Sequence, residues 1–102
     1  MKETNIVQTI RLGTADIAVL FRNNTGALKD INGRLVKYGL HVGSPDLVGW
    51  RISDGLFCGI GVKQPGKKPT PEQITFINAV KKSGGLAGVA TDLEEARKII
   101  LS

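Results

Sequence analysis

The sequence has little of the two residue types that most often build zinc sites and disulfides. Its 102 residues include one cysteine, Cys58, and one histidine, His41. A single cysteine cannot form a disulfide within the chain, and one residue of each kind is too few for a Cys/His zinc site. These scarcities exclude a disulfide-rich secreted scaffold and a zinc finger, and they favour a cytoplasmic protein.

Long apolar runs are also missing. No stretch approaches the roughly 20 residues of a membrane-spanning helix. The first ten residues, MKETNIVQTI, lack the apolar middle of a secretory signal. With 41% hydrophobic residues in a chain of this length, we expect a single domain over residues 1–102, with a modest core and no association with a membrane.

Acidic residues are fewer than basic ones, nine against fourteen, which gives a formal net charge of +5. Three of the nine acids lie in the last eleven residues, so the remaining surface is more basic than the total suggests. This balance is compatible with an anionic partner such as nucleic acid, although many small basic proteins bind none.

The segment 43–63 reads as a β-hairpin. Asp54-Gly55 separates two apolar runs, which is the strongest short-range signal for such a turn. A two-residue loop pairs Ser53 with Leu56 and, further out, Asp46 with Lys63. A longer turn with a bulge would shift this register.

Alternation along the second hairpin strand sorts its residues by face. Gly61 and Lys63 share one face, with Asp46 beside them. Cys58 falls on the apolar face, where we expect a structural thiol. We expect Trp50 to pack as well, because one tryptophan without other aromatic residues makes no base-stacking platform.

Hydrophobic periodicity places the other elements. Ile6, Val7 and Ile10 predict a helix over residues 2–12, and the apolar run 17–21 predicts a strand buried on both faces. Thr70 and Thr91 each begin a capping box, which predicts a helix after each of them. The small residues 86–90 predict a short strand. The predicted inward stripes are Ile74, Ile77 and Val80 in the first of these helices, and Leu93, Ala96 and Ile100 in the second.

This order, αβββαβα, predicts a mixed four-stranded sheet flanked by helices on both faces, in which a helix makes the right-handed crossover to the last strand. Residues 27–42 are less regular. Asp30–Gly33 resembles a turn before a short extended piece, Arg34–Tyr38. Leu35, Tyr38 and Leu40 have no expected core role, and His41 is left out of the site.

Several motifs resemble one family when they are taken in order. Ser44-Pro45-Asp46 and Gly61-Val62-Lys63 resemble the two halves of the PD-(D/E)XK nuclease signature, with glycine in place of the second acid. Four further segments narrow the resemblance to the VRR-NUC (virus-type replication-repair nuclease) domain, of a small stand-alone phage or bacterial type. They are Arg22-Asn23-Asn24-Thr25-Gly26, Tyr38-Gly39-Leu40, Thr70-Pro71-Glu72-Gln73 and Gly84-Gly85.

The resemblance implies an α/β fold with a restriction-endonuclease-like core and hydrolysis of DNA with Mg²⁺ or Mn²⁺. It implies that Asp46, the carbonyl of Val62 and Glu3 hold the metal, and that Lys63 serves the attacking water. Gly61 stands where the family has a catalytic glutamate, so we expect this chain to be inactive or weakened.

The resemblance also implies a residue for support of the site, and position in loops beside the predicted metal cleft indicates residues for contact with DNA. Gln73 is a possible active-site support, although its place in a capping box explains it without catalysis. The expected DNA-binding residues are Arg22, Asn23, Asn24, Lys67 and Lys68. The two lysines lie in a loop rich in proline and glycine, where an ordinary solvated loop is the alternative.

Three hypotheses stay open. The first is an impaired endonuclease, selective for branched or junction DNA, that acts as a homodimer in the cytoplasm (the host's, if phage-encoded). The second is a non-catalytic DNA-binding module with a nuclease-like fold, and the third is a small structural domain. Cleavage with Mg²⁺ or Mn²⁺ separates the first from the others, and salt-sensitive DNA binding separates the second from the third.

Overall fold

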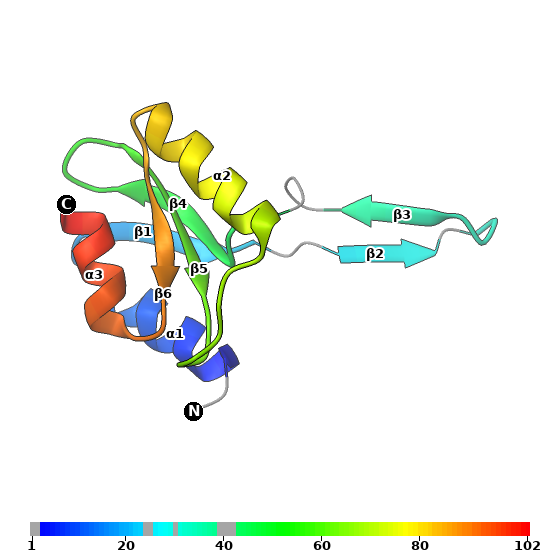
Figure 1. Cartoon of the computed structure of the whole chain (residues 1–102), viewed down its shortest axis with the longest axis horizontal. Coiled ribbons are helices and arrows are strands. Elements are labelled where there is room, and N and C mark those ends of the chain that lie inside the picture. The colour runs from blue at the N-terminus through cyan, green and yellow to red at the C-terminus, as the bar shows by residue number, and fades with distance from the viewer. Residues whose placement is uncertain (1–2, 24–25, 30, 39–42) are drawn as a thin grey trace.

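The computed structural model describes residues 3–23, 26–29, 31–38 and 43–102; of residues 4, 26–29 and 35–38 it describes the backbone. Figure 1 shows its three helices and six strands. In chain order these are α1 (Glu3–Gly13), β1 (Ala18–Arg22), β2 (Gly26–Lys29), β3 (Leu35–Tyr38), β4 (Leu47–Arg51), β5 (Phe57–Val62), α2 (Pro71–Lys82), β6 (Leu86–Ala90) and α3 (Leu93–Leu101).

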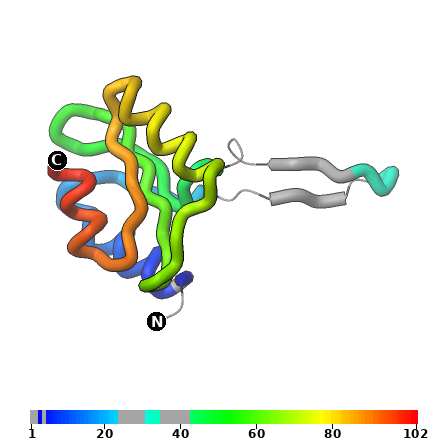
Figure 2. Tube along the Cα trace, viewed as in Figure 1, coloured from blue at the N-terminus to red at the C-terminus, as the bar shows by residue number. Residues whose placement is uncertain are grey.

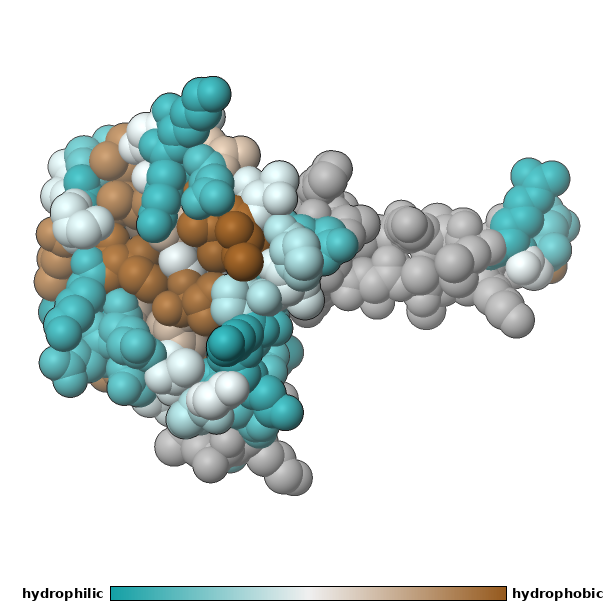
Figure 3. Space-filling model, viewed as in Figure 1, coloured by the Kyte–Doolittle hydropathy of each residue, from teal (hydrophilic) through white to brown (hydrophobic). Residues whose placement is uncertain are grey.

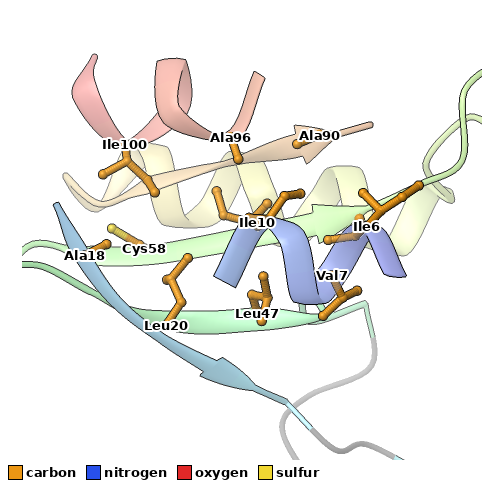
Figure 4. Packing of buried hydrophobic residues seen from close by; sticks show 12 residues of the cluster. Ile6, Val7, Ile10, Ala18, Leu20, Leu47, Cys58, Ala90, Ala96 and Ile100 are labelled. Carbon is orange, nitrogen blue, oxygen red and sulfur yellow. The ribbon is translucent and has the colours of Figure 1, made fainter. Parts of the chain in front are cut away.

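The main sheet has four strands in the order β1-β4-β5-β6. β1, β4 and β5 are antiparallel, and β6 lies parallel to β5 after the α2 crossover. α1 and α3 cover one face, while α2 lies on the other (Figures 1 and 4). The predicted mixed sheet with helices on both faces is confirmed, and the arrangement is a restriction-endonuclease-like core.

β2 and β3 form a separate antiparallel pair, with Gly26 opposite Tyr38 and Lys29 opposite Leu35. The sequence indicates the extended piece that became β3 but not β2, because GALK has neither alternation nor β-branched residues. Residues 39–42 lie outside the described part of the chain, as do the side chains of β3. The expectations for Leu40 and His41 therefore lie outside it too.

The core is packed between the sheet and the α1/α3 layer. Figure 4 shows α1 directing Ile6, Val7 and Ile10 toward the strands, as their helical spacing predicts. Cys58 is fully buried among them, and this burial raises the pKa of its thiol, as expected for a structural residue. The other members of the cluster are Ala18, Leu20, Leu47, Ile60, Val62, Ala90, Ala96 and Ile100.

β1 is buried on one face only, which corrects the prediction of a strand buried on both. Ala18 and Leu20 face the core, whereas Val19 and Phe21 are 39% and 49% exposed. Trp50, on β4, is 45% exposed, so the expectation that it packs is also wrong. The physical reason is the position of α2, which packs against β5 and β6 rather than against β1 and β4.

α2 begins as predicted and packs less deeply than predicted. Thr70 caps it, and Gln73 completes the capping box. Ile77 and Val80 are half-buried, but Ile74 is 45% exposed and does not belong to an inward stripe. Figure 3 shows apolar surface gathered between α2 and α3, over β6, at the edge of the sheet.

α3 begins one residue later than expected. Asp92, not Thr91, is its N-cap and accepts a hydrogen bond from the Glu95 backbone. Thr91 instead donates its own N–H to the Glu95 carboxylate at 2.7 Å. The Thr91 hydroxyl also donates to this carboxylate, and the hydroxyl and backbone bonds from Thr91 lower the pKa of Glu95. An N-cap aspartate accepts from the first turn as well as threonine does, so the sequence did not separate the two candidates.

The β4–β5 turn is tied to the end of α3. Gly55 donates its N–H to the Arg51 carbonyl at 2.8 Å, which closes a loop over residues 52–55. The Arg51 guanidinium bonds the Asp54 carboxylate, and it also donates to the carbonyls of Ile100 and Ser102 at 2.7 and 3.2 Å. The trace in Figure 2 accordingly brings the C-terminal residue beside this turn.

Candidate functional site

The four-residue turn sets the register of the hairpin. Leu47 lies opposite Ile60, so one step further out Asp46 lies opposite Gly61. The predicted pairs Ser53–Leu56 and Asp46–Lys63 are therefore wrong by two residues. A shift of two keeps every side chain on its predicted face, so Asp46, Gly61 and Lys63 still share one face of the sheet.

The Asp46 carboxylate closes the β4–β5 ladder. Its Oδ2 accepts a hydrogen bond from the Val62 backbone N–H at 2.7 Å. In the observed register the ladder carbonyl for that N–H would come from Pro45, but the Pro45 carbonyl accepts from the Asn23 side chain at 3.0 Å. A side-chain oxygen thus replaces a backbone oxygen where the two strands separate.

The Val62 carbonyl lies at the same end of the ladder. Alternation of the antiparallel bonds directs it, like the Val62 N–H, toward β4. Pro45 lies opposite and has no N–H to donate to it. A backbone oxygen and a carboxylate therefore lie together, and both are the hard oxygen donors that Mg²⁺ prefers.

Asn23 holds the loop that carries Asp46. Its side-chain amide donates to Ser44 Oγ at 2.7 Å and to the Pro45 carbonyl, and its backbone N–H donates to the Asp46 carbonyl at 2.9 Å. This amide is engaged within the protein, so Asn23 organises the loop. Arg22 is exposed at the same end of the sheet, opposite Leu47. Asn24 lies outside the described residues.

Position 61 accepts a Cβ without a clash. A Cβ built there would lie 3.5 Å from Val89 Cγ2 and 3.7 Å from the Gly88 carbonyl, both ordinary contacts. A Cβ at Gly59 would lie 2.8 Å from Pro45 Cγ, and one at Gly49 would overlap the Val19 carbonyl oxygen. Packing therefore demands glycine at 59 and 49 but not at 61, on the face that carries Asp46.

Lys63 follows directly after β5 and is half-buried. Its backbone N–H donates to the Ala90 carbonyl at 3.1 Å, which holds the residue at the end of the parallel pair. Lys67 and Lys68 come next, exposed in a loop that turns at Gly66, whose φ is +87°. Two of the residues predicted to contact DNA, Lys67 and Lys68, thus lie exposed in the loop behind Lys63, the predicted catalytic lysine.

The start of α2 packs against the loop that leads to Asp46. Gly43 has a φ of +84°, and a Cβ there would lie 2.5 Å from the Glu72 carbonyl oxygen. Only glycine suits this close approach. The neighbouring Gln73 uses Oε1 to accept from the Thr70 N–H at 2.9 Å, so its capping role is confirmed. Its support of an active site stays a prediction.

Glu3 lies in the first turn of α1 and is exposed. In Figure 4 Val7 lies beside Leu47, so α1 begins at the end of the sheet that carries Asp46. Within the described ranges, however, no three His, Cys, Asp or Glu side chains form a group able to hold a metal ion. The register places Asp46 and the Val62 carbonyl at the same end of the ladder, and the metal-ligand roles of Asp46, Val62 and Glu3 stay predictions.

Two features of the site were missed from the sequence. One is the Asp46–Val62 bond, and the other is the set of hydrogen bonds from Asn23 to residues 44–46, which we call the Asn23 clamp. No local pattern indicates the first, because Pro45 lacks an N–H but keeps the carbonyl that could accept from Val62, and it is Asn23 that engages this carbonyl. The clamp joins residues more than twenty positions apart, and no local pattern indicates it.

Residues 7–92 match the model of the VRR-NUC domain. The matched range contains every strand, α2 and most of α1. No curated protein matches the chain. Across the part of the chain that the structure describes, no helix is both long and apolar enough to cross a membrane.

Proposed function

Because the chain belongs to the VRR-NUC family, we propose that it is a metal-dependent DNA endonuclease domain weakened or inactivated by glycine at position 61. The family implies nuclease activity on DNA. We further propose Mg²⁺ or Mn²⁺ as cofactor, branched or junction DNA as substrate, and a homodimer as the active form. The observation that carries the proposal is the position of Asp46, bonded at the end of β5 and opposite Gly61, where a Cβ makes only ordinary contacts.

The described residues offer a partial fit to such an ion. Asp46 and the Val62 carbonyl would hold it, and the ion would supply polarisation of the scissile phosphate and acidification of a water. Lys63, on the same face, would orient that water and offset the charge that develops on the phosphate. Lys67, Lys68 and Arg22 would hold the DNA backbone at this end of the sheet.

Gly61 explains why we expect poor turnover. With one carboxylate the negative charge at the site is small, and nothing from position 61 constrains the geometry. Misplacement by about 1 Å can cost on the order of a hundredfold in rate. Removal of the acid also leaves Lys63 beside less negative charge, which favours binding of phosphate over its cleavage.

The decisive experiment compares the glycine chain with Gly61→Glu and Gly61→Gln. Glutamine has the size of glutamate without its charge, and a Cβ at position 61 makes only ordinary contacts. We expect Gly61→Glu to cut DNA about a hundredfold faster than the other two, with Mg²⁺ or Mn²⁺ and not with chelator. Branched and plain duplex DNA are compared in the same assay. If the glycine chain cuts as fast as the glutamate variant, the active site lies elsewhere.

Gly61 itself favours a second candidate, a DNA-binding module that has lost the chemistry. This module would bind DNA in a salt-dependent manner through its basic loop. It would show no cleavage in any of the three proteins. The same set of proteins therefore decides between the two functions.

A further inference from the structure

Three of the five aromatic residues of the chain lie together on the face of the sheet that carries α2. Phe21, Trp50 and Phe57 are 49%, 45% and 39% exposed, and we call them the aromatic face. Trp50 lies directly opposite Phe57, while Phe21 lies opposite Val48 and hence diagonal to Trp50. Opposite and diagonal positions are within reach of aromatic side chains, so the three rings are neighbours. The expectation that Trp50 has no aromatic neighbours for a stacking platform is therefore wrong.

The aromatic face is continuous with the candidate site. A Cβ built at Gly59 would lie 3.3 Å from Phe57 Cε2 and 2.8 Å from Pro45 Cγ, so these two rings lie over the same glycine. Pro45 directly precedes Asp46 in the chain. Along β4, Asp46 and Trp50 are four residues apart on one face, which at about 3.3 Å per residue is roughly 13 Å. Apolar surface thus extends from Trp50 to the residue beside the proposed metal ligand.

Charged residues lie at the rim of the aromatic face and not among its rings. Val48 and Gly59, which pair with one another between the rings, carry no charge. Arg22 follows Phe21 directly on the edge strand and is exposed. Lys63 lies on the same face just beyond β5, beside the acidic Asp46. Proteins that bind unpaired nucleic acid combine rings for the bases with cations for the phosphates, and this arrangement offers both.

We propose that the aromatic face binds unpaired bases, so that one strand of the DNA substrate stacks on it next to the candidate site. That the partner is DNA rests on the proposed function, which this surface deepens by selecting substrates with an unpaired strand near the cleaved bond. Every base has a π face, so the binding is independent of sequence. The bases of a blunt duplex are stacked inside the helix and cannot use the rings.

The first measurement separates bases from phosphates. Fluorescence anisotropy of labelled oligonucleotides, with chelator present and at one salt concentration, compares an oligothymidylate strand, an abasic strand of the same length and a blunt duplex. The abasic strand keeps the phosphates and lacks the bases. We expect oligothymidylate to bind the unmodified chain at least about fivefold more tightly than the abasic strand does, which corresponds to one stacked base.

Variants of the aromatic face locate the source of this preference. Trp50→Ala and Phe57→Ala should each weaken the binding of oligothymidylate at least about fivefold and leave the abasic strand and the duplex nearly unchanged. Trp50→Phe keeps an aromatic ring at that position and should retain most of the preference. Leu12→Ala, on α1 and 67% exposed, is the matched control and should behave as the unmodified chain does. Circular dichroism establishes that each variant folds.

Trp50 is the only tryptophan of the chain, so its emission reports on the aromatic face directly. We expect oligothymidylate to quench this emission and the abasic strand to leave it nearly unchanged. Equal affinity of the unmodified chain for the two strands overturns the proposal. An equal loss of affinity for both strands in Trp50→Ala overturns it too, because the residue would then act through the fold. Self-association that Trp50→Ala abolishes, without any preference for bases, would make the face a protein contact and also overturn it.

Cleavage bears on the nuclease proposal alone. A chain that prefers oligothymidylate to the abasic strand but does not cut DNA even as Gly61→Glu supports the stacking surface and contradicts the nuclease. A Gly61→Glu chain that cuts DNA but shows no preference between the two strands supports the nuclease and contradicts the stacking surface.

Discussion

Among single residues, Asp46 has a structural task besides its proposed role as a ligand. Its carboxylate satisfies the Val62 N–H, which is buried and has Pro45 opposite it. A buried donor that loses its partner costs about 1–3 kcal/mol. Loss of activity in an alanine variant would therefore mix two causes, damage to the fold and removal of the charge.

Asparagine and alanine at position 46 separate the two tasks. We predict that Asp46→Ala lowers the free energy of unfolding by about 1–3 kcal/mol, because Val62 loses its acceptor. Asp46→Asn keeps an oxygen in place, so its stability stays within about 0.5 kcal/mol of the parent. In the Gly61→Glu background both variants lose cleavage. Urea unfolding of the three proteins measures the stabilities; equal losses in Asn and Ala would show that charge, not hydrogen bonding, matters to the fold.

The faces of these residues could be predicted from the sequence, but their register could not. Alternation along a strand places Asp46, Gly61 and Lys63 on one face, and a shift by two leaves that result intact. The length of the turn decides the register. In the structure, Arg51 bonds Asp54 within the turn and reaches carbonyls at the end of α3, and the Asp-Gly signal does not indicate these long-range bonds.

At the scale of elements, the loop between β5 and α2 is the proposed binding surface for the DNA backbone. Lys67 and Lys68 are exposed in it, just behind Lys63. We predict that alanine at both positions weakens binding to DNA of any sequence. The slope of log affinity against log salt should become shallower by about 0.9 for each phosphate that the protein no longer neutralises, or roughly 2 for the pair.

Two other lysines provide the control for this loop. Lys81 and Lys82 lie in the last turn of α2, at the end near the β4–β5 turn and away from Asp46. Alanine at these two positions removes the same charge from the protein and should leave the salt slope nearly unchanged. A salt slope that responds equally to both double variants would mean that net charge alone attracts DNA, without a defined binding surface at the loop.

Helix starts that have strong local sequence signals were predicted well. The burial of side chains, which depends on where a helix packs on the sheet, was not. The Thr70 capping box fixes the start of α2 within the sequence itself. The burial of Ile74, Val19 and Phe21 instead depends on where α2 lies across the sheet. α2 packs against β5 and β6. Hydrophobic periodicity does not indicate whether a helix covers this half of the sheet face or the half formed by β1 and β4.

For the whole molecule, two ion pairs make stability depend on pH, one between distant segments and one within the β4–β5 turn. Arg97, on α3, bonds Asp16 and the carbonyl of Gly13 at the end of α1. Arg51 bonds Asp54 and the end of α3. Hydrogen bonds from these guanidiniums hold the pKa of Asp16 and the pKa of Asp54 below their ordinary value of 3.8.

A depressed pKa in the folded state means that the unfolded chain binds more protons at low pH. The stabilisation is complete above the ordinary value and disappears as pH falls through the lower folded values. We predict a melting temperature that is steady near neutral pH and falls below about pH 4. Asp16→Asn with Asp54→Asn should flatten that fall, modestly because both carboxylates are exposed. Thermal unfolding between neutral and acidic pH measures the effect; an unchanged pH profile would contradict it.

The bond from Val62 to Asp46 also makes one proton of the backbone a reporter. Most amide protons of β5 point at carbonyls, but this one points at a carboxylate whose surroundings change whenever a cation arrives. In a nitrogen–proton correlation spectrum, the Val62 resonance should therefore move on addition of Mg²⁺, while resonances deeper in the same strand stay still. This measurement requires neither DNA nor cleavage. It can therefore detect metal binding by the chain with Gly61 even if that chain does not cleave DNA.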